Sequence, residues 1–132
     1  MKNKILLLTL ILCLGVIASG VFAKSQAMAI TVDIPSGKGV YKSKSVTKDY
    51  VSNQKVYHIS TMSNHDGSKI NMFARLYNVD YDSYNSWVEF GPGDDHSYGG
   101  IFRNTGNYKL EIKNSKWSIY TYFTSGTWQY SI

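Results

Sequence analysis

The stretch that decides the fold is INMFARLY, residues 70–77, in which two kinds of position alternate. Every second position is a small or medium-sized apolar residue: Ile70, Met72, Ala74 and Leu76. Successive side chains of a β-strand point to opposite faces of a sheet, so a repeat of two residues indicates a strand. We therefore predict a strand over residues 70–77 with this apolar face on a core.

A turn precedes this strand at residues 64–67, NHDG. The Asp66-Gly67 pair is a strong turn signal, because glycine adopts positive φ angles without steric cost. Residues 55–62, on the other side of the turn, form a second expected strand. We therefore expect residues 55–62 and 70–77 to pair as a β-hairpin.

The rest of the chain continues the strand pattern. Residues 108–113, YKLEIK, alternate apolar and charged side chains, which is typical of a sheet with one buried face. Less regular patterns predict shorter strands near residues 29–33, 39–42, 45–51, 86–90 and 100–103. Roughly seven to nine short strands separated by turns predict an all-β domain, a small antiparallel β-sandwich, with a small β-barrel as the alternative.

The C-terminal segment is rich in aromatic residues. Residues 117–123, WSIYTYF, place Trp117 and Phe123 on the same face of a strand. Ser125-Gly126 predicts a turn, and Trp128 follows it. We expect Trp117, Phe123 and Trp128 to fill the core.

The N-terminal residues predict a secretory signal peptide. Two lysines precede an apolar run over residues 5–17, which is too short to cross a bilayer because a membrane helix needs about 20 apolar residues. Small-x-small sequences end at Ala23 and, as the alternative cleavage site, at Ala29. We expect residues 1–23 to be removed and residues 24–132 to form a single secreted β-domain.

The cysteine content and the charge limit the compartment and the partners. Cys13 is the only cysteine and leaves with the signal, and a secreted domain without disulfides favours a bacterial source, with the lysine-flanked signal indicating a Gram-positive one. Loss of two signal lysines reduces the 14 basic residues to 12 against nine acidic ones, a net charge of about +3. We expect a secreted or cell-surface protein that contacts a cell-wall polymer, a glycan or a membrane surface, and no nucleic acid.

Four aromatic residues form the predicted ligand-binding set. They lie in or beside the polar segments between residues 78 and 100: Tyr81, Tyr84, Trp87 and Tyr98. Tyrosine and tryptophan present an apolar ring with a polar tip, which suits sugar stacking, peptide recognition or a membrane interface. We expect exposed rings here, because the apolar alternation fails and acidic residues keep the backbone near water.

Four aspartates in the same region form the predicted metal-binding set: Asp80, Asp82, Asp94 and Asp95. Alternate oxygen-bearing residues from Asp80 resemble the start of a calcium loop, but Gly91 stands at the twelfth position, where an acidic ligand is required. The expectation is no cofactor other than a calcium ion at these aspartates. The alternative is that Asp94 and Asp95 satisfy local backbone donors.

The sequence lacks the common catalytic motifs, which favours a protein that is not an enzyme. The chain contains no Gly-x-Ser-x-Gly elbow, no His-Glu-x-x-His helix and no glycine-rich phosphate loop. The only histidines, His58, His65 and His96, are scattered along the sequence. We expect no catalytic residue, and a secreted hydrolase that uses Asp94, Asp95 and His96 ranks third among the functional hypotheses.

Residues 106–114, GNYKLEIKN, followed by SGTW at residues 125–128, resemble the closing strands of small secreted bacterial β-sandwich modules. The resemblance implies the same fold and transfers no functional residue. The leading hypothesis is a non-enzymatic secreted protein that binds a cell-surface or extracellular ligand through residues 78–100. A secreted bacteriocin- or toxin-like antimicrobial effector is the alternative.

Overall fold

Two antiparallel β-sheets make up the computed structural model, which describes residues 25–37, 39–115 and 117–131. The first sheet has four strands in the order β1 (Gln26–Ile34), β10 (Tyr122–Ser131), β4 (Gln54–Ser63) and β8 (Asp95–Tyr98). The expected signal peptide, residues 1–23, lies outside the described residues. None of the described helical turns is long and apolar enough to cross a bilayer.

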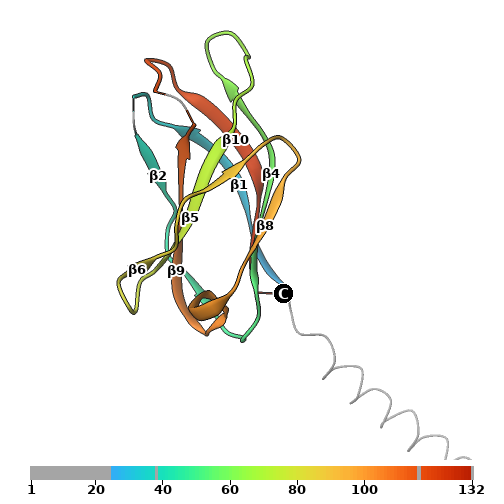
Figure 1. Ribbon diagram of the computed structural model, residues 1–132, viewed down its shortest axis with the longest axis vertical. Helices are drawn as coiled ribbons and strands as arrows, with labels where there is room; N and C mark the ends of the chain where they lie inside the picture. The colour runs from blue at the N-terminus through green and yellow to red at the C-terminus, as the bar shows by residue number, and fades with distance from the viewer. Residues whose placement is uncertain (1–24, 38, 116, 132) are drawn as a thin grey trace, which may run out of the picture.

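The second sheet has six strands. Its main path runs β2 (Val40–Lys42), β9 (Gly106–Asn114), β5 (Met72–Asn78) and β6 (Ser83–Tyr84), while β3 (Val46–Lys48) also pairs with β9 and β7 (Val88–Phe90) also pairs with β5. Figure 1 shows the two sheets facing each other as layers. The predicted all-β sandwich is confirmed, and the barrel alternative is wrong because the described strands form two separate sheets.

The core lies between the inner faces of the sheets. The alternation that defined the strands over residues 70–77 and 108–113 is confirmed by the fully buried side chains of β5 and β9: Met72, Ala74, Leu76, Tyr108, Leu110 and Ile112. Aliphatic residues of β1 and the indole of Trp128 on β10 meet them from the other sheet. Burial of these apolar surfaces is the main term that stabilises the sandwich.

The predicted hairpin between residues 55–62 and 70–77 forms only next to its turn, where Met62 and Lys69 make an isolated antiparallel bridge, and it is wrong for the rest of both strands. β4 pairs with β10 and β8, whereas β5 pairs with β9, β6 and β7, so the two segments belong to different sheets. Gly67 has a φ of 72°, and the chain does turn there. The turn signal is local, and it does not specify whether the next strand pairs with the previous one or crosses to the facing sheet.

Strand β10 differs from its prediction in where it starts and which way it faces. Residues 117–121 precede the strand, and Trp117 is 65% exposed. Tyr122 is buried and Phe123 points outward, so Trp117 and Phe123 are not core residues, while Trp128 is. Aromatic residues occupy both faces of this segment, so its facing cannot be read from alternation, and a slip of one residue reverses every side chain.

The turn predicted at Ser125-Gly126 is also wrong. β10 continues through both residues, and its register with β4 shifts between them, which is a β-bulge. A Cβ atom at Gly126 would collide with the carbonyl oxygen of Tyr57 on the neighbouring strand. Glycine is needed here because the two backbones approach closely, not because the chain reverses.

Two segments exchange their predicted roles around residue 98. No strand was predicted between residues 91 and 99, yet Asp95–Tyr98 forms β8 and pairs with β4. Gly100–Arg103 was expected to be a strand and is a short 3₁₀ helix. Four residues form too short a strand to show a clear alternation, which is why β8 was not recognised.

Candidate binding surface on the six-stranded sheet

The outer face of the six-stranded sheet carries aromatic and basic side chains in cross-strand rows. The register of β9 with β5 sets three pairs side by side: Lys113 with Phe73, Glu111 with Arg75, and Lys109 with Tyr77. Residues directly opposite each other on one face of an antiparallel pair lie within contact distance. The residues that alternate with the core positions therefore meet as a continuous surface.

Arg75 is the centre of this surface. Its guanidinium carbon lies 3.9 Å from the ring centroid of Tyr84 and 4.4 Å from that of Trp87. Its Nη2 lies 2.9 Å from Oε1 of Glu111, whose side chain is almost completely buried. The ring of Tyr84 also stacks on Tyr77, with centroids 4.5 Å apart. These contacts fix the rings and leave the Arg75 charge paired within the protein.

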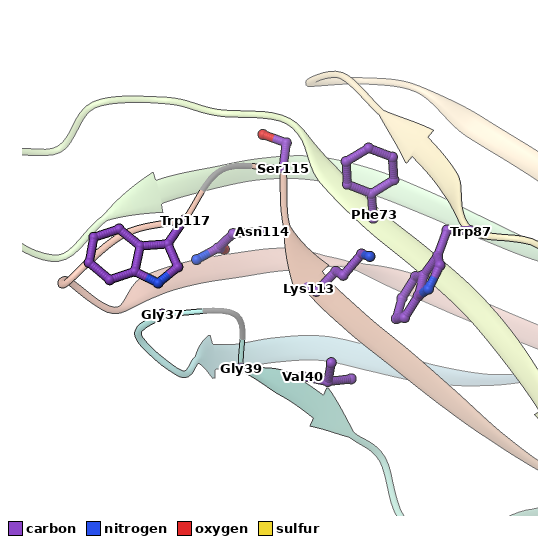
Figure 2. Close-up of a pocket in the computed structure, with 9 residues that line it drawn as sticks. All are labelled: Gly37, Gly39, Val40, Phe73, Trp87, Lys113, Asn114, Ser115 and Trp117. Atoms are coloured by element: carbon purple, nitrogen blue, oxygen red, sulfur yellow. The ribbon is translucent and has the colours of Figure 1, made fainter.

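Lys113 lies at the end of the surface nearest the β9–β10 loop. Its Nζ is 4.4 Å from the ring centroid of Trp87 and 5.5 Å from that of Phe73. These residues border a trough with a cavity volume of about 480 Å³, which lies within the usual size range of small-molecule sites. Figure 2 shows Lys113 between Phe73 and Trp87, with Trp117 at the opposite end of the trough.

The Trp117 end of the trough is held by contacts between two loops. The backbone N–H of Gly37, in the β1–β2 loop, donates a hydrogen bond to the carbonyl of Ser118. Gly37 has a φ of 74°, a conformation that glycine adopts without strain. Trp117 Nε1 lies 3.7 Å from the position that a Cβ of Gly37 would occupy, so the indole sits against this loop.

Asn114 contributes the polar group of the trough. Its side chain projects from the side of β9 opposite to Lys113 and points toward Trp117 in Figure 2. Its Oδ1 and Nδ2 atoms are both buried and have no hydrogen-bond partner among the described residues. A buried amide without partners costs free energy, which a group that supplies a donor and an acceptor would recover.

The four aromatic residues predicted to bind a ligand are divided by the structure. Trp87 lines the trough. Tyr84 does not line it, but its ring stacks on the Arg75 guanidinium, which also contacts Trp87. Tyr81 is 73% exposed but does not line the trough. Tyr98 is only 3% exposed, so its expected position in an open loop is wrong, and burial raises the pKa of its phenol. β8 turns this side chain into the core.

The four aspartates predicted to bind a metal are each engaged locally. Asp80 accepts two hydrogen bonds from Asn107, which lower the pKa of its carboxyl, and Asp82 accepts one from the Tyr77 hydroxyl at 2.7 Å. The backbone N–H of Gly91 donates to Asp94 at 2.7 Å, and Asp95 pairs with Lys55 at 3.4 Å. The described residues contain no group of three or more acidic, histidine or cysteine side chains that could hold a metal ion.

His58 and His96 both make T-shaped contacts with the ring of Phe90, but they differ in burial. His58 is buried, with Nδ1 2.8 Å from the Gly91 carbonyl oxygen and Nε2 2.8 Å from the Thr61 hydroxyl. His96 is exposed and contacts the ring edges of Phe90 and Tyr98. Both nitrogens of His58 are thus used in structural contacts inside the sandwich.

Trp87 is the one predicted site residue among the nine that line the trough, and the side chains on which the site depends were missed: Phe73, Lys113, Asn114 and Trp117. The signal for Phe73 is present in the sequence, because a large aromatic residue occupies a position that alternation assigns to solvent. Trp117 was assigned to the core instead. Asn114 carries no such signal, since its importance depends on the two loops that meet beside it.

Comparisons with known proteins show distant structural likeness. No protein-family model and no curated protein matches the chain. The crystal structure of the Yersinia pseudotuberculosis-derived mitogen is 15% identical, with a TM-score of 0.43, over 79% of this chain and 86% of the mitogen. A protein of the T13 viral particle of IBDV is 15% identical, with a TM-score of 0.44, over 78% of this chain, which spans 30% of the viral protein.

Proposed function

We propose that this domain is a non-enzymatic glycan-binding protein whose ligand lies in the trough between Trp87 and Trp117. The observation that carries the proposal is the combination of indole rings at both ends of one trough with the unpartnered amide of Asn114. Indole rings stack on the apolar faces of sugar rings, and an amide offers one donor and one acceptor to sugar hydroxyls.

Because the Asn114 amide is covered, the proposed binding requires a side chain to move before the ligand reaches it. Its amide atoms are covered, so a hydroxyl reaches them only when a neighbouring side chain shifts. Trp117 is the suitable element, because its side chain is mostly exposed and exposed side chains change rotamer within nanoseconds. Movement of one ring would admit a sugar and provide the surface on which it stacks.

The proposal places the domain outside the cytoplasm, as the signal-like sequence of residues 1–23 indicates. A binding role rather than a hydrolytic one is supported by the surroundings of the candidate catalytic groups. Asp94 caps the Gly91 backbone and Asp95 pairs with Lys55, so neither carboxylate is directed at His96. A general base requires a partner that orients it.

The test is retention of the purified domain on immobilised glycans: bacterial peptidoglycan, chitin and polygalacturonate. We expect Trp117→Ala to weaken retention about two- to tenfold, since one stacked ring contributes roughly 0.5–1.5 kcal/mol. Tyr81→Ala is the matched control, because it removes an equally exposed ring outside the trough. Equal loss in both variants, or no retention of the wild type on these three glycans or on wall teichoic acid, would refute the proposal.

A further inference from the structure

The cations around the trough differ in whether the protein already neutralises them. Between described residues the structure contains two ion pairs, Lys55 with Asp95 and Arg75 with Glu111. Lys113 belongs to neither, although it lies beside the aromatic rings of the trough. Its neighbours along β9 and β5 leave it half-buried, so its charge is screened less than that of a fully exposed lysine.

The acidic groups of this face do not offset that charge directly. Glu111 is buried and bound to Arg75 in the adjacent row. Glu89 lies in the same row as Lys113, but Phe73 stands between them and Asn71 donates a hydrogen bond to the Glu89 carboxylate. An ammonium bordered by rings, with no carboxylate within ion-pair distance among the described residues, favours an anionic group on a ligand.

We infer that the glycan bound in the trough is anionic and that Lys113 recognises its carboxylate or phosphate group. The inference rests on the proposed function and adds the substrate class to it. Lys113 Nζ lies 4.4 Å from the centroid of the Trp87 ring. A sugar stacked at this end therefore brings an acidic substituent at its edge next to the ammonium. Asn114, on the other side of β9, remains to bind neutral hydroxyls.

The roles of the two cations follow from their partners. Arg75 holds the rings of Tyr84 and Trp87 in place and has its charge satisfied by Glu111, so it is a positioning residue. Lys113 is the residue that distinguishes an acidic sugar from its neutral counterpart. Loss of Lys113 should therefore change the preference between ligands more than it changes the stability of the sheet.

The experiment compares retention on polygalacturonate, on its neutral methyl ester and on wall teichoic acid, whose charge is phosphate. Lys113→Met keeps an apolar stem and removes the charge. Lys109→Met is the matched control, because Lys109 lies on the same face of β9 but outside the trough. We expect the wild type to bind an anionic glycan about tenfold more tightly than the methyl ester, and Lys113→Met alone to lose this preference.

The probes separate the possible outcomes. Preference for polygalacturonate identifies a carboxylate ligand and preference for teichoic acid a phosphate ligand, and either supports the inference. Retention on the methyl ester that equals retention on both anionic glycans overturns the inference and leaves the glycan-binding function intact. Anionic lipid vesicles are the fourth probe, and retention on them but on no glycan overturns both the inference and the glycan-binding function. A preference that Lys109→Met also abolishes would show a diffuse charge effect and overturn the role of Lys113.

Discussion

The outer faces of the two sheets obey the same alternation rule and carry different chemistry. On the four-stranded sheet the outward positions of β1 and β10 include one aromatic ring, Phe123, and are otherwise mainly small or polar: Ala27, Ala29, Thr31, Ser125 and Thr127. On the six-stranded sheet the outward positions of β5 and β9 include Phe73, Arg75 and Lys113. The comparison teaches that the inner positions specify the sandwich, and that function is to be sought where the outer positions depart from ordinary solvated side chains.

The largest expected effect is on the free energy of unfolding, and it tests whether Trp128 serves the structure while Trp117 serves binding. Trp128→Ala should destabilise the domain by about 3–5 kcal/mol, because it removes a fully buried ring. It also removes the Nε1–H that donates to Gln54 Oε1 at 3.0 Å. Trp117→Ala should change stability by less than about 0.5 kcal/mol. Urea unfolding measures both, and similar losses would break the distinction.

The second prediction asks how much stability the outer face of the six-stranded sheet contributes. Glu111→Ala should cost about 2–3 kcal/mol, because it leaves the Arg75 guanidinium partly buried without its carboxylate. Glu89→Ala is the control on the same face, where the carboxylate only accepts from Asn71 at the surface. Equal unfolding free energies for the two variants would show that the Arg75–Glu111 pair is not structural.

The third prediction compares one phenylalanine on each outer face. Phe73→Ala should weaken glycan retention about tenfold, which corresponds to about 1.4 kcal/mol, because Phe73 lines the trough. Phe123→Ala, on the outer face of the other sheet, should leave retention unchanged within a factor of about two. Binding isotherms on the glycan that the wild type prefers decide the matter, and a larger loss for Phe123→Ala would move the site to the four-stranded sheet.

The smallest effect concerns tyrosine ionisation. Donation to Asp82 raises the pKa of Tyr77 to about 12, and burial raises that of Tyr98. Because the unfolded chain ionises near pH 10, both groups stabilise the fold fully below about pH 10, and the contribution of Tyr77 falls as the pH rises through about 12. Phenolate absorbance should show Asp82→Asn ionising Tyr77 at lower pH than the wild type does. An unchanged titration would contradict the role of Asp82.

Strands with one clear apolar face could be predicted from the sequence. Small or medium-sized apolar residues recur at every second position of β5, and apolar residues alternate with charged ones in β9; both sets face the core as expected. β10 could not be assigned in the same way, because Tyr122 and Phe123 are adjacent aromatics and only the pairing with β1 and β4 decides which is buried. Pairing between distant segments is a tertiary property that local patterns do not contain.

The candidate site could be predicted only in part. Trp87 lines the candidate trough, and it could be singled out because it interrupts the pattern near polar turns; Tyr84, chosen on the same ground, lies outside the lining. Tyr98 was misplaced because β8 is too short to show alternation. The joining of Trp117 to Asn114 and Gly37 depends on two loops more than 70 residues apart in the chain, as the hydrogen bond from Gly37 to Ser118 shows.

The pairing of β1 with β10 has a consequence for how the domain is presented. Gln26 lies opposite Ser131, so the first and last described strands begin and end side by side. Figure 1 shows that end of the sandwich opposite the β1–β2 and β9–β10 loops, which border the trough. A domain tethered to a support, a fusion partner or a cell wall through either terminus would hold its trough outward, away from the attachment point.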